Sequence, residues 1–216
     1  MKRAIYWCTI DQFPNATQRE TMLDQLPVFL QKNTKEYRND NDFARSLIGK
    51  LLVKKGLADF GKEDLLLSIE RNKFGRYVCP NKELDFNISH SGNAVVVAFD
   101  LEGKVGIDIQ EKSKGSLLIA ERFFAPSEVE WIKNHADLNY AFTHIWTRKE
   151  AVVKATGTGI RIPLNSFLVL NDEVEMEGEP FYLQSDLQYS SNYYLTVCSN
   201  LNLPYEIRKV DIAELG

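Results

Sequence analysis

Cysteine and histidine are scarce in this chain of 216 residues, which contains three of each. The cysteines Cys8, Cys79 and Cys198 lie far apart, and no Cys-x-x-Cys or Cys/His ligand spacing occurs. We therefore expect buried thiols and no metal cage built from cysteine.

Long hydrophobic runs are also absent. The chain begins with a basic pair followed by an apolar run of strand length, and no stretch of about 18 apolar residues occurs anywhere. A membrane-spanning helix needs a longer apolar segment, and so does a secretory signal. We therefore expect a cytoplasmic protein.

Positive charge is not in excess, because the chain has 26 Lys and Arg and 30 Asp and Glu, which gives a formal net charge of −4. This balance argues against a nucleic-acid-binding protein that relies on a broad basic surface. Neither a G-x-x-x-x-G-K-[ST] loop nor a protein-kinase signature set occurs. The phosphotransferases that carry those motifs are therefore disfavoured.

The composition supports a sizeable core, with 44% hydrophobic and 11% aromatic residues. Apolar spacing predicts helices from about 39–42 to Gly56, from 126, and over 137–155. Strands are expected at 4–10, 65–69, 94–99, 104–109, 166–170, 181–184, 193–198 and 205–210, with 94–99 and 104–109 as a hairpin around Glu102 and Gly103.

The order strand, helices, strands occurs twice, and no linker separates the two copies. We therefore predict an α/β (α+β) fold of two similar halves, residues 1–104 and 105–216, that together form one unit. A cofactor would most naturally lie in the cleft between such halves. The acidic segment 171–180 is expected to be a hairpin loop.

An acidic side chain interrupts the apolar segment Val105 to Gln110. Because side chains alternate along a strand, Asp108 and Gln110 share one face, while Ile107 and Ile109 point to the core. A buried carboxylate needs a partner or a cation. Asp108 is thus either a metal ligand or a salt-bridged strand end.

A second acidic group lies in the segment from Trp146 to Gly159, which predicts a helix that ends at glycines. Glu150 and Lys154 are four residues apart and face the same way. A solvated helix pair explains this spacing, and so does a site for a phosphate ester and a metal.

Hydroxyls and an imidazole gather in the segment Phe86 to Gly92, which includes Ser89 and His90. This composition suits contact with an anion, although a histidine often caps a turn. The segment Lys73 to Arg76 places two cations around a glycine, and a solvated turn is the simpler interpretation.

Together, Phe86–Ser91, Gly106–Gln110 and Trp146–Lys154 resemble, in order and separation, the motifs of the 4′-phosphopantetheinyl transferases of the surfactin-synthetase type. The resemblance covers about residues 40 to 170, and it implies a pseudo-dimeric single chain with the active site between two similar halves. It also implies that coenzyme A and Mg²⁺ bind there and that a carrier-protein serine attacks the β-phosphate, releasing 3′,5′-ADP.

The resemblance assigns roles to matching residues. Asp108 and Glu150 would be metal ligands, Glu150 would also receive the serine proton, and Lys154 would neutralise the leaving ADP phosphate. The remaining matches would contact coenzyme A: Ser89 and His90 on the 3′-phosphate side, Arg45 and Arg76 as further phosphate partners, and Lys32 or Lys35 in the N-terminal segment.

One departure concerns Gln110, where many family members carry a carboxylate. Its amide oxygen is a possible third ligand of Mg²⁺ or of a coordinated water, whereas Glu111 points to the opposite strand face. We therefore expect activity with altered metal affinity. A module that binds coenzyme A or a carrier protein without transfer is the alternative.

The expected protein partner is an apo acyl- or peptidyl-carrier protein, and a pseudo-dimeric chain is expected to work as a monomer. Neither nucleic acid nor a membrane is expected as a partner. Apolar residues after the Asp108 strand offer a surface for a partner helix, or else belong to the core. They are Leu117, Leu118, Phe123 and Phe124.

Overall fold

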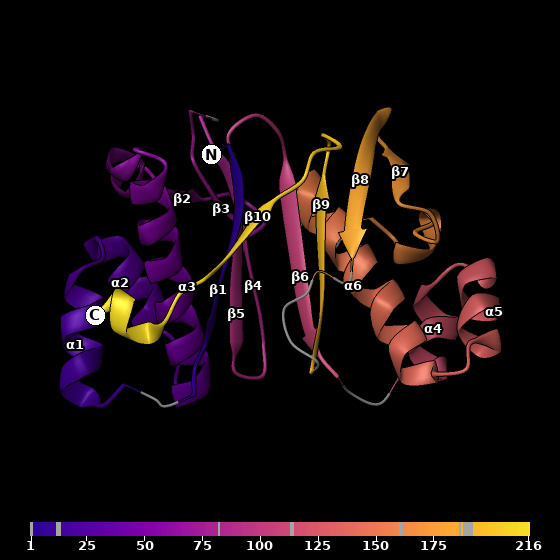
Figure 1. Ribbon diagram of the computed structural model, residues 1–216, viewed down its shortest axis with the longest axis horizontal. Helices are drawn as coiled ribbons and strands as arrows, with labels where there is room; N and C mark the ends of the chain where they lie inside the picture. The colour runs from indigo at the N-terminus through magenta and orange to yellow at the C-terminus, as the bar shows by residue number, and fades with distance from the viewer. Residues whose placement is uncertain are drawn as a thin grey trace. The chain divides into compact units, whose positions relative to one another are not determined.

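The computed structural model describes residues 2–11, 14–81, 83–112, 115–159, 162–185, 187 and 192–216. The chain divides into two compact units, Met1–Glu102 with Pro204–Gly216, and Gly103–Leu203. Each unit has a four-stranded sheet with helices packed on one face (Figure 1). The predicted α/β (α+β) class, with two units of similar design, is confirmed.

The first unit has a sheet of order β10-β1-β5-β4, in which β1 is antiparallel to β5 and parallel to β10. Its helices and the two-stranded β2-β3 sheet complete the unit. The elements are β1 Arg3–Thr9, α1 Ala16–Asp24, α2 Val28–Lys35, α3 Asp40–Asp59, η1 Glu63–Leu67, β2 Glu70–Arg71, β3 Tyr77–Val78, β4 Asp85–Ser91, β5 Ala94–Asp100, β10 Glu206–Lys209 and η4 Ile212–Leu215.

Helix α3 is the central helix of the first unit. The side chain of Asn39 caps it by accepting hydrogen bonds from the backbone N–H groups of Asn41 and Asp42. The prediction that Gly56 ends this helix is wrong, because α3 continues to Asp59. Gly56 instead allows close packing, since a Cβ there would lie 2.3 Å from the ring of Phe99.

The second unit has an antiparallel sheet of order β6-β9-β8-β7, with the long helix α6 packed on β6 and β9. Smaller helices lie beyond α6 (Figure 1). The elements are β6 Val105–Glu111, α4 Leu117–Phe123, α5 Pro126–Asn134, α6 Leu138–Thr156, η3 Leu164–Ser166, β7 Glu173–Met176, β8 Glu179–Ser185 and β9 Tyr193–Ser199.

Helix α6 begins and ends where its capping residues predict. Asp137 accepts a hydrogen bond from the backbone N–H of Tyr140 at 3.0 Å, and Gly157 closes the helix with φ 69°. The helix lies directly on β6 because Gly106 has no side chain. A Cβ there would lie 2.2 Å from the carbonyl oxygen of Ala151.

The predicted hairpin of 94–99 and 104–109 is wrong. Strand β5 pairs with β1 and β4, whereas β6 pairs with β9 in the other sheet. The division between the units falls at Glu102 and Gly103, so the short polar connection joins two sheets and is not a hairpin turn. Both strands have seven residues and are largely buried, and neither feature shows whether two strands that are consecutive in sequence also pair in one sheet.

Other local predictions also need correction. Residues 65–69 fall largely in the 3₁₀ helix η1, and Ser166 is the last residue of η3, after which residues 167–170 form no strand. The segment 171–180 contains β7, because its buried side chains alternate with exposed glutamates. The side chains of Val174 and Met176 are buried in the core, so the expectation that the whole segment is a loop is wrong.

The C-terminal boundary of the second half, predicted at 216, is also wrong. Residues 204–216 belong to the first unit, because β10 adds to the edge of β1 and Gln25 donates a hydrogen bond to the carbonyl of Leu215. Among the described helices, none has both the length and the apolar composition that a membrane crossing requires.

Candidate functional site

Asp108 and Lys154 form the centre of the candidate site in the second unit. Asp108 lies on β6 and is 2% exposed, and the ammonium of Lys154 on α6 lies 2.6 Å from its Oδ1. Lys154 also donates to the carbonyl of Ile107 at 3.1 Å. Packing of α6 on β6 therefore brings together two residues that are 46 positions apart.

Glu150 adds a second carboxylate on the same side of α6. Its burial, and next the negative charge of Asp108, raise the pKa of Glu150, while Lys154 acts in the opposite direction. The ion pair with Lys154 offsets part of the cost of burying Asp108. Lys154 does not balance both carboxylates, so the group carries an excess negative charge when both are ionised.

Gln110 completes the polar face of β6 that is turned to α6. Its amide nitrogen lies 3.3 Å from Oδ2 of Asp108, and the residue is half-buried. The core cluster of this unit also lies on the α6 side of the sheet, and it does not include Ile107 or Ile109. Both isoleucines are nevertheless fully buried on the opposite face of β6, which confirms the prediction that they belong to the buried core of the protein.

The donor set is suited to a hard divalent cation. Among the described residues, no group of three or more His, Cys, Asp or Glu side chains is arranged for a metal. Magnesium commonly binds one or two carboxylates together with substrate phosphates and water. The carboxylates of Asp108 and Glu150 and the amide oxygen of Gln110 supply that chemistry, and a cation would offset the excess negative charge.

The basic residues that precede Glu150 have structural partners. Lys149 is fully buried and lies 2.8 Å from Oε2 of Glu128, which is also fully buried. Arg148 donates to the carbonyls of Val169 and Asn171. These contacts anchor α6 to α5 and to the loop before β7, so the backbone that carries Glu150 is held in place.

A chain of hydroxyls next to Asp108 was not predicted. Thr196 lies opposite Asp108 in the β6-β9 register, and its hydroxyl is 3.1 Å from those of Thr147 and Ser185. The three residues come from α6, β8 and β9. Only the pairing of distant strands brings them together, and no local motif marks that pairing.

The first unit holds the residues expected to contact phosphates. Arg45 on α3 donates to the carbonyl of Gly92 at 2.9 Å and to Asp42 at 2.6 Å. Its Nε is buried without a hydrogen-bond partner in the described part of the chain. Lys32 and Lys35 are exposed in the last turn of α2.

Arg76 is held by the start of β4. Its Nη2 lies 2.8 Å from both carboxylate oxygens of Asp85 and donates to the carbonyl of Phe86 at 3.1 Å. Asn72 closes the preceding turn by accepting from the backbone N–H groups of Phe74 and Arg76. This segment is therefore a hydrogen-bonded turn that positions a cation.

Ser89 and His90 lie on β4, a strand that the sequence did not predict. Ser89 is 5% exposed, whereas His90 is exposed. Neighbouring residues of a strand point to opposite faces, so the two side chains diverge. Ile88 packs against Gly49 of α3, so Ile88 and His90 lie on the face of the sheet that the helices cover. Ser89 lies on the opposite face.

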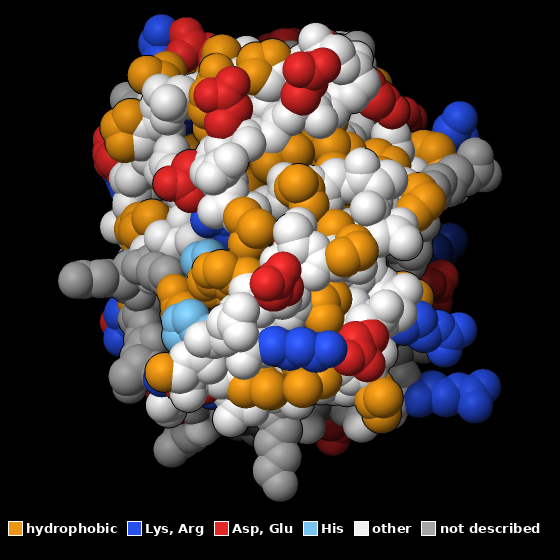
Figure 2. Space-filling view, turned by 90° about the vertical axis from the view of Figure 1, so that its right-hand side faces the viewer, with side chains coloured by type: hydrophobic (Ala, Val, Ile, Leu, Met, Phe, Trp, Pro, Cys, Tyr) orange, Lys and Arg blue, Asp and Glu red, His pale blue; other side chains and the backbone are white. Residues whose placement is uncertain are grey.

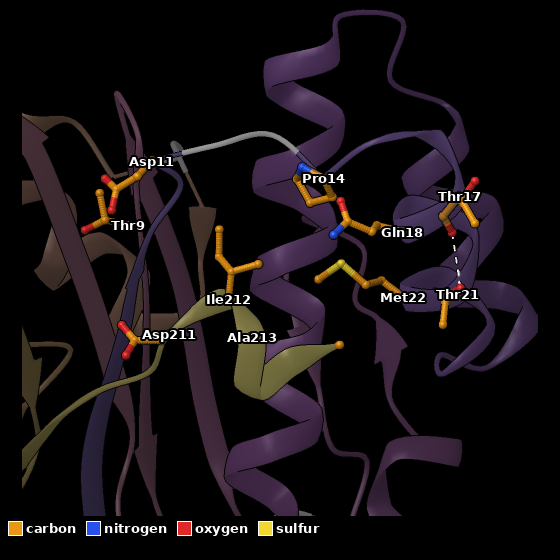
Figure 3. Close-up of a pocket in the computed structure, with 11 residues that line it drawn as sticks. Thr9, Asp11, Pro14, Thr17, Gln18, Thr21, Met22, Asp211, Ile212 and Ala213 are labelled. Carbon is orange, nitrogen blue, oxygen red and sulfur yellow. Dashed lines mark hydrogen bonds between the residues drawn. The ribbon is translucent and has the colours of Figure 1, made fainter.

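A cavity of about 720 Å³ lies elsewhere in the first unit (Figure 3). Side chains from the end of β1, from α1 and from the C-terminal segment surround it (Figure 3). None of the predicted site residues lines this cavity. The lining residues are Thr9, Asp11, Pro14, Thr17, Gln18, Thr21, Met22, Asp211, Ile212, Ala213 and Gly216.

The apolar residues after β6 divide between surface and core. Leu118 and Phe123 on α4 are 80% and 42% exposed, whereas Phe124 is buried and stacks on Phe142. Leu117 is partly buried against the core of this unit. Figure 2 views the side of the molecule where α4 and α5 lie, and apolar side chains are interspersed there with charged ones.

Comparison with known proteins gives two adjoining family matches. Residues 13–102 match the N-terminal model of 4′-phosphopantetheinyl transferase, and residues 104–198 match the 4′-phosphopantetheinyl transferase superfamily. A 4′-phosphopantetheinyl transferase from Bacillus subtilis is 30% identical over 207 residues, which cover 90% of this chain and 91% of that protein. The chain belongs to the 4′-phosphopantetheinyl transferase family.

Two further relatives of this transferase support the assignment. The 4′-phosphopantetheinyl transferase Sfp of Bacillus subtilis strain 168 is 28% identical over 225 residues, or 98% of this chain and 99% of Sfp. The transferase gsp of Aneurinibacillus migulanus is 36% identical over 144 residues, or 64% of this chain and 59% of that protein. The predicted family and enzyme class are thereby confirmed.

Proposed function

We propose that this enzyme transfers the 4′-phosphopantetheine arm of coenzyme A to a serine of an apo acyl- or peptidyl-carrier protein. The serine oxygen forms a bond to the β-phosphorus, and the bond from that phosphorus to the bridging oxygen breaks. The products are the holo carrier and 3′,5′-ADP. The grouping of Asp108, Glu150 and Lys154 in a transferase of this family is the observation that carries the proposal.

Asp108, Glu150 and the amide oxygen of Gln110 would hold Mg²⁺. When bound, the cation would neutralise charge on the pyrophosphate of coenzyme A. Phosphoryl transfer requires mainly positioning and charge neutralisation, so no covalent nucleophile on the enzyme is needed. The ammonium of Lys154 would stabilise the negative charge that develops on the leaving 3′,5′-ADP.

Glu150 would accept the proton of the attacking serine, directly or through a water. A general base works best when its pKa approaches the working pH. Burial and the negative charge of Asp108 raise the pKa of Glu150, which brings it closer to the working pH. Anchoring of α6 by the buried pair Lys149 and Glu128 supports this role, because it limits movement of the backbone that carries the base.

The first unit would bind the phosphates of coenzyme A. Arg45 and Arg76 have guanidinium groups held by backbone carbonyls and one carboxylate each, a pre-ordered arrangement suited to phosphate oxygens. Ser89 and His90 would contact the 3′-phosphate side. Because the two side chains leave opposite faces of β4, we expect them to contact different atoms of the ligand.

The carrier protein would dock through α4 of the second unit. The exposed side chains of Leu118, Ile119 and Phe123 supply an apolar surface for a partner helix. Phe124 takes no part in this proposal, because it is buried. The net charge of −4 gives no general attraction to acidic carriers, so docking would depend on this local surface.

The transfer is tested by measuring holo-carrier formation with coenzyme A and Mg²⁺. Glu150→Gln should slow the reaction by at least about 100-fold, since general-base catalysis contributes roughly 10²- to 10⁴-fold. Glu130→Gln on the exposed side of α5 is the matched control and should have normal activity. Equal rates in the two variants would refute the role of Glu150.

A module that binds without transferring is the alternative, and the same experiment separates it. Coenzyme A binding to the wild-type chain, measured by calorimetry, combined with no modification of any carrier would favour that module. The carboxylate pair together with Lys154 favours the transferase, because binding alone does not require a base that can accept a proton.

A further inference from the structure

Lys50 is a buried cation that the proposed chemistry does not use. It lies on α3, is 3% exposed, and forms no ion pair with any residue in the described ranges. Burial, and next the charge of Arg71, lower its pKa to about 8. A buried ammonium without a carboxylate is costly, so an apolar residue at this position would stabilise the fold better.

The hydrogen-bond partners of Lys50 are two hydroxyls, and its ammonium also lies 5.7 Å from the centroid of the Tyr77 ring. Its Nζ lies 2.7 Å from Oγ1 of Thr34 on α2 and 2.6 Å from Oγ of Ser46 on α3. An ammonium only donates hydrogen bonds, so both hydroxyl oxygens accept from it. The hydroxyl of Thr34 in turn donates a hydrogen bond to the carbonyl oxygen of Leu30 at 2.9 Å.

Ser46 differs from Thr34 because its proton has no acceptor among the residues that the structure describes. The lone-pair side of its oxygen is turned to Lys50, which directs the O–H away from the buried ammonium. Ser46 is also half-buried, whereas Thr34 is fully buried. An orientated hydroxyl donor is therefore available to a ligand at this point of α3.

The neighbours of Ser46 favour an anionic ligand. Arg45 precedes it on α3 and has a buried Nε without a partner in the described part of the chain. Lys32 and Lys35 flank Thr34 on α2, and both are exposed. A hydroxyl donor among cations suits the oxygens of a phosphate monoester, which accept several charge-assisted hydrogen bonds.

We propose that Lys50 is a positioning residue that orients the Ser46 hydroxyl as a donor to the 3′-phosphate of coenzyme A. Lys50 itself does not touch the ligand. It contributes to discrimination between coenzyme A and 3′-dephospho-coenzyme A, two ligands that differ only in the phosphate monoester. The inference rests on the proposed function, because that function supplies coenzyme A as the ligand.

The test is calorimetric binding of both ligands to the full chain without a carrier. Lys50→Met should weaken coenzyme A binding about three- to tenfold, the worth of one hydrogen bond, and leave 3′-dephospho-coenzyme A binding unchanged. Ser46→Ala should do the same. The double variant should match Ser46→Ala alone, because the two residues act through one hydroxyl.

Lys54→Met is the matched control. Lys54 lies one turn further along α3 and donates to Oε1 of Gln25 at 2.7 Å, so the substitution removes a similar side chain that does not contact Ser46. The Lys54→Met variant should show the same preference for coenzyme A over 3′-dephospho-coenzyme A as the wild type. A role for Lys50 confined to holding α2 against α3 would affect unfolding and leave this preference unchanged.

The outcomes separate the inference from the function on which it rests. A wild-type chain that does not bind coenzyme A would overturn both. Normal wild-type binding with an unchanged preference in Lys50→Met, or additive losses in the double variant, would overturn the role of Lys50 alone. If Lys50→Met does not fold, an unchanged preference in Ser46→Ala overturns the inference equally, because that substitution removes only a hydroxyl.

Discussion

Single side chains determine the charge around Asp108. In the part of the chain that the structure describes, the carboxylates of Asp108 and Glu150 lie there with the ammonium of Lys154 and the neutral amide of Gln110. A third carboxylate at that position would add negative charge and a stronger ligand for a divalent cation. The identity of residue 110 therefore sets how tightly the proposed site holds Mg²⁺.

Gln110→Glu should lower the Mg²⁺ concentration that half-maximal transfer requires. We expect this direction because a carboxylate binds Mg²⁺ more strongly than an amide oxygen. Titration of transfer activity against Mg²⁺ measures the effect. Glu111→Gln, on the exposed opposite face of the strand, should leave the requirement unchanged. An unchanged or raised requirement in Gln110→Glu would place Gln110 outside the metal site.

Lys50 should make the stability of the protein depend on alkaline pH. Its pKa is lowered from 10.5 to about 8 in the folded protein, so the unfolded chain binds more protons between these values. The buried ammonium of Lys50 destabilises the folded protein fully below about pH 8, and this destabilisation is lost as the pH rises to 10.5. It amounts to about 3 kcal/mol by the conversion of pKa shifts to free energy.

Urea unfolding of the wild type and of Lys50→Met at several pH values measures this contribution. Arg71 lowers the pKa of Lys50 and Glu36 raises it, so both stay unchanged in the comparison. The free energy of unfolding of Lys50→Met relative to the wild type should fall as the pH rises from 8 to 10.5. A difference that does not vary with pH would show that Lys50 titrates normally.

The residues of the candidate site are predictable from sequence to different degrees. Asp108, Glu150 and Lys154 are recognised because they lie in motifs of fixed order. The helical spacing that suggests a pair of Glu150 with Lys154 does not reveal the ion pair of Lys154 with Asp108. The helix and strand that form this pair are distant in sequence, and only their packing brings the two charges together.

At the scale of elements, the site depends on how closely α6 lies on β6. Gly106 permits that approach, and Asp108 follows it by two residues on the same face of the strand. The buried pair of Lys149 and Glu128 holds the other side of α6. Displacement of the helix by a fraction of an ångström would therefore change the distance between Lys154 and Asp108.

Gly106→Ala should destabilise the second unit by about 3 kcal/mol, because the added methyl group would lie 2.2 Å from the Ala151 carbonyl oxygen. The midpoint of urea unfolding measures the loss. Gly49→Ala is the comparison, since its added Cβ would lie 3.1 Å from a movable side-chain atom of Ile88 and alanine favours a helix. Similar stability of the two variants would contradict the close packing of α6 on β6.

Lys149→Met should lower the free energy of unfolding by about 3 to 5 kcal/mol, because it leaves the fully buried carboxylate of Glu128 without its charged partner. Lys133→Met removes an exposed ion pair with Glu121 and should cost less than about 1 kcal/mol. Thermal or urea unfolding measures both values. A small loss in Lys149→Met would show that Glu128 is neutral or solvated.

Predictions of elements were most reliable where local chemistry determines the outcome. The capping carboxylate of Asp137 and the left-handed Gly157 mark the ends of α6 in the sequence itself. The predicted pairing of β5 with β6 was wrong, because both strands carry buried apolar residues and strand pairing leaves no local signal in the sequence. Strand β4 was missed because its polar residues resemble those of a loop.

At the scale of the whole molecule, two units of similar design divide the proposed tasks. The second unit carries the carboxylates and Lys154, and the first carries the cations assigned to the phosphates of coenzyme A. The similar design was predictable from the repeated order of strands and helices. The return of residues 204–216 to the first unit was not, because parallel pairing of β10 with β1 connects opposite ends of the chain.

The most direct test of the central claim is the intact mass of apo carrier proteins incubated with this enzyme, coenzyme A and Mg²⁺. Fatty-acid, polyketide and peptide carriers are each tested beside a version whose acceptor serine is alanine. The account predicts that at least one carrier gains the mass of a single phosphopantetheine arm and that its alanine version gains none. No addition to any of the three carriers, with coenzyme A binding intact, would contradict it.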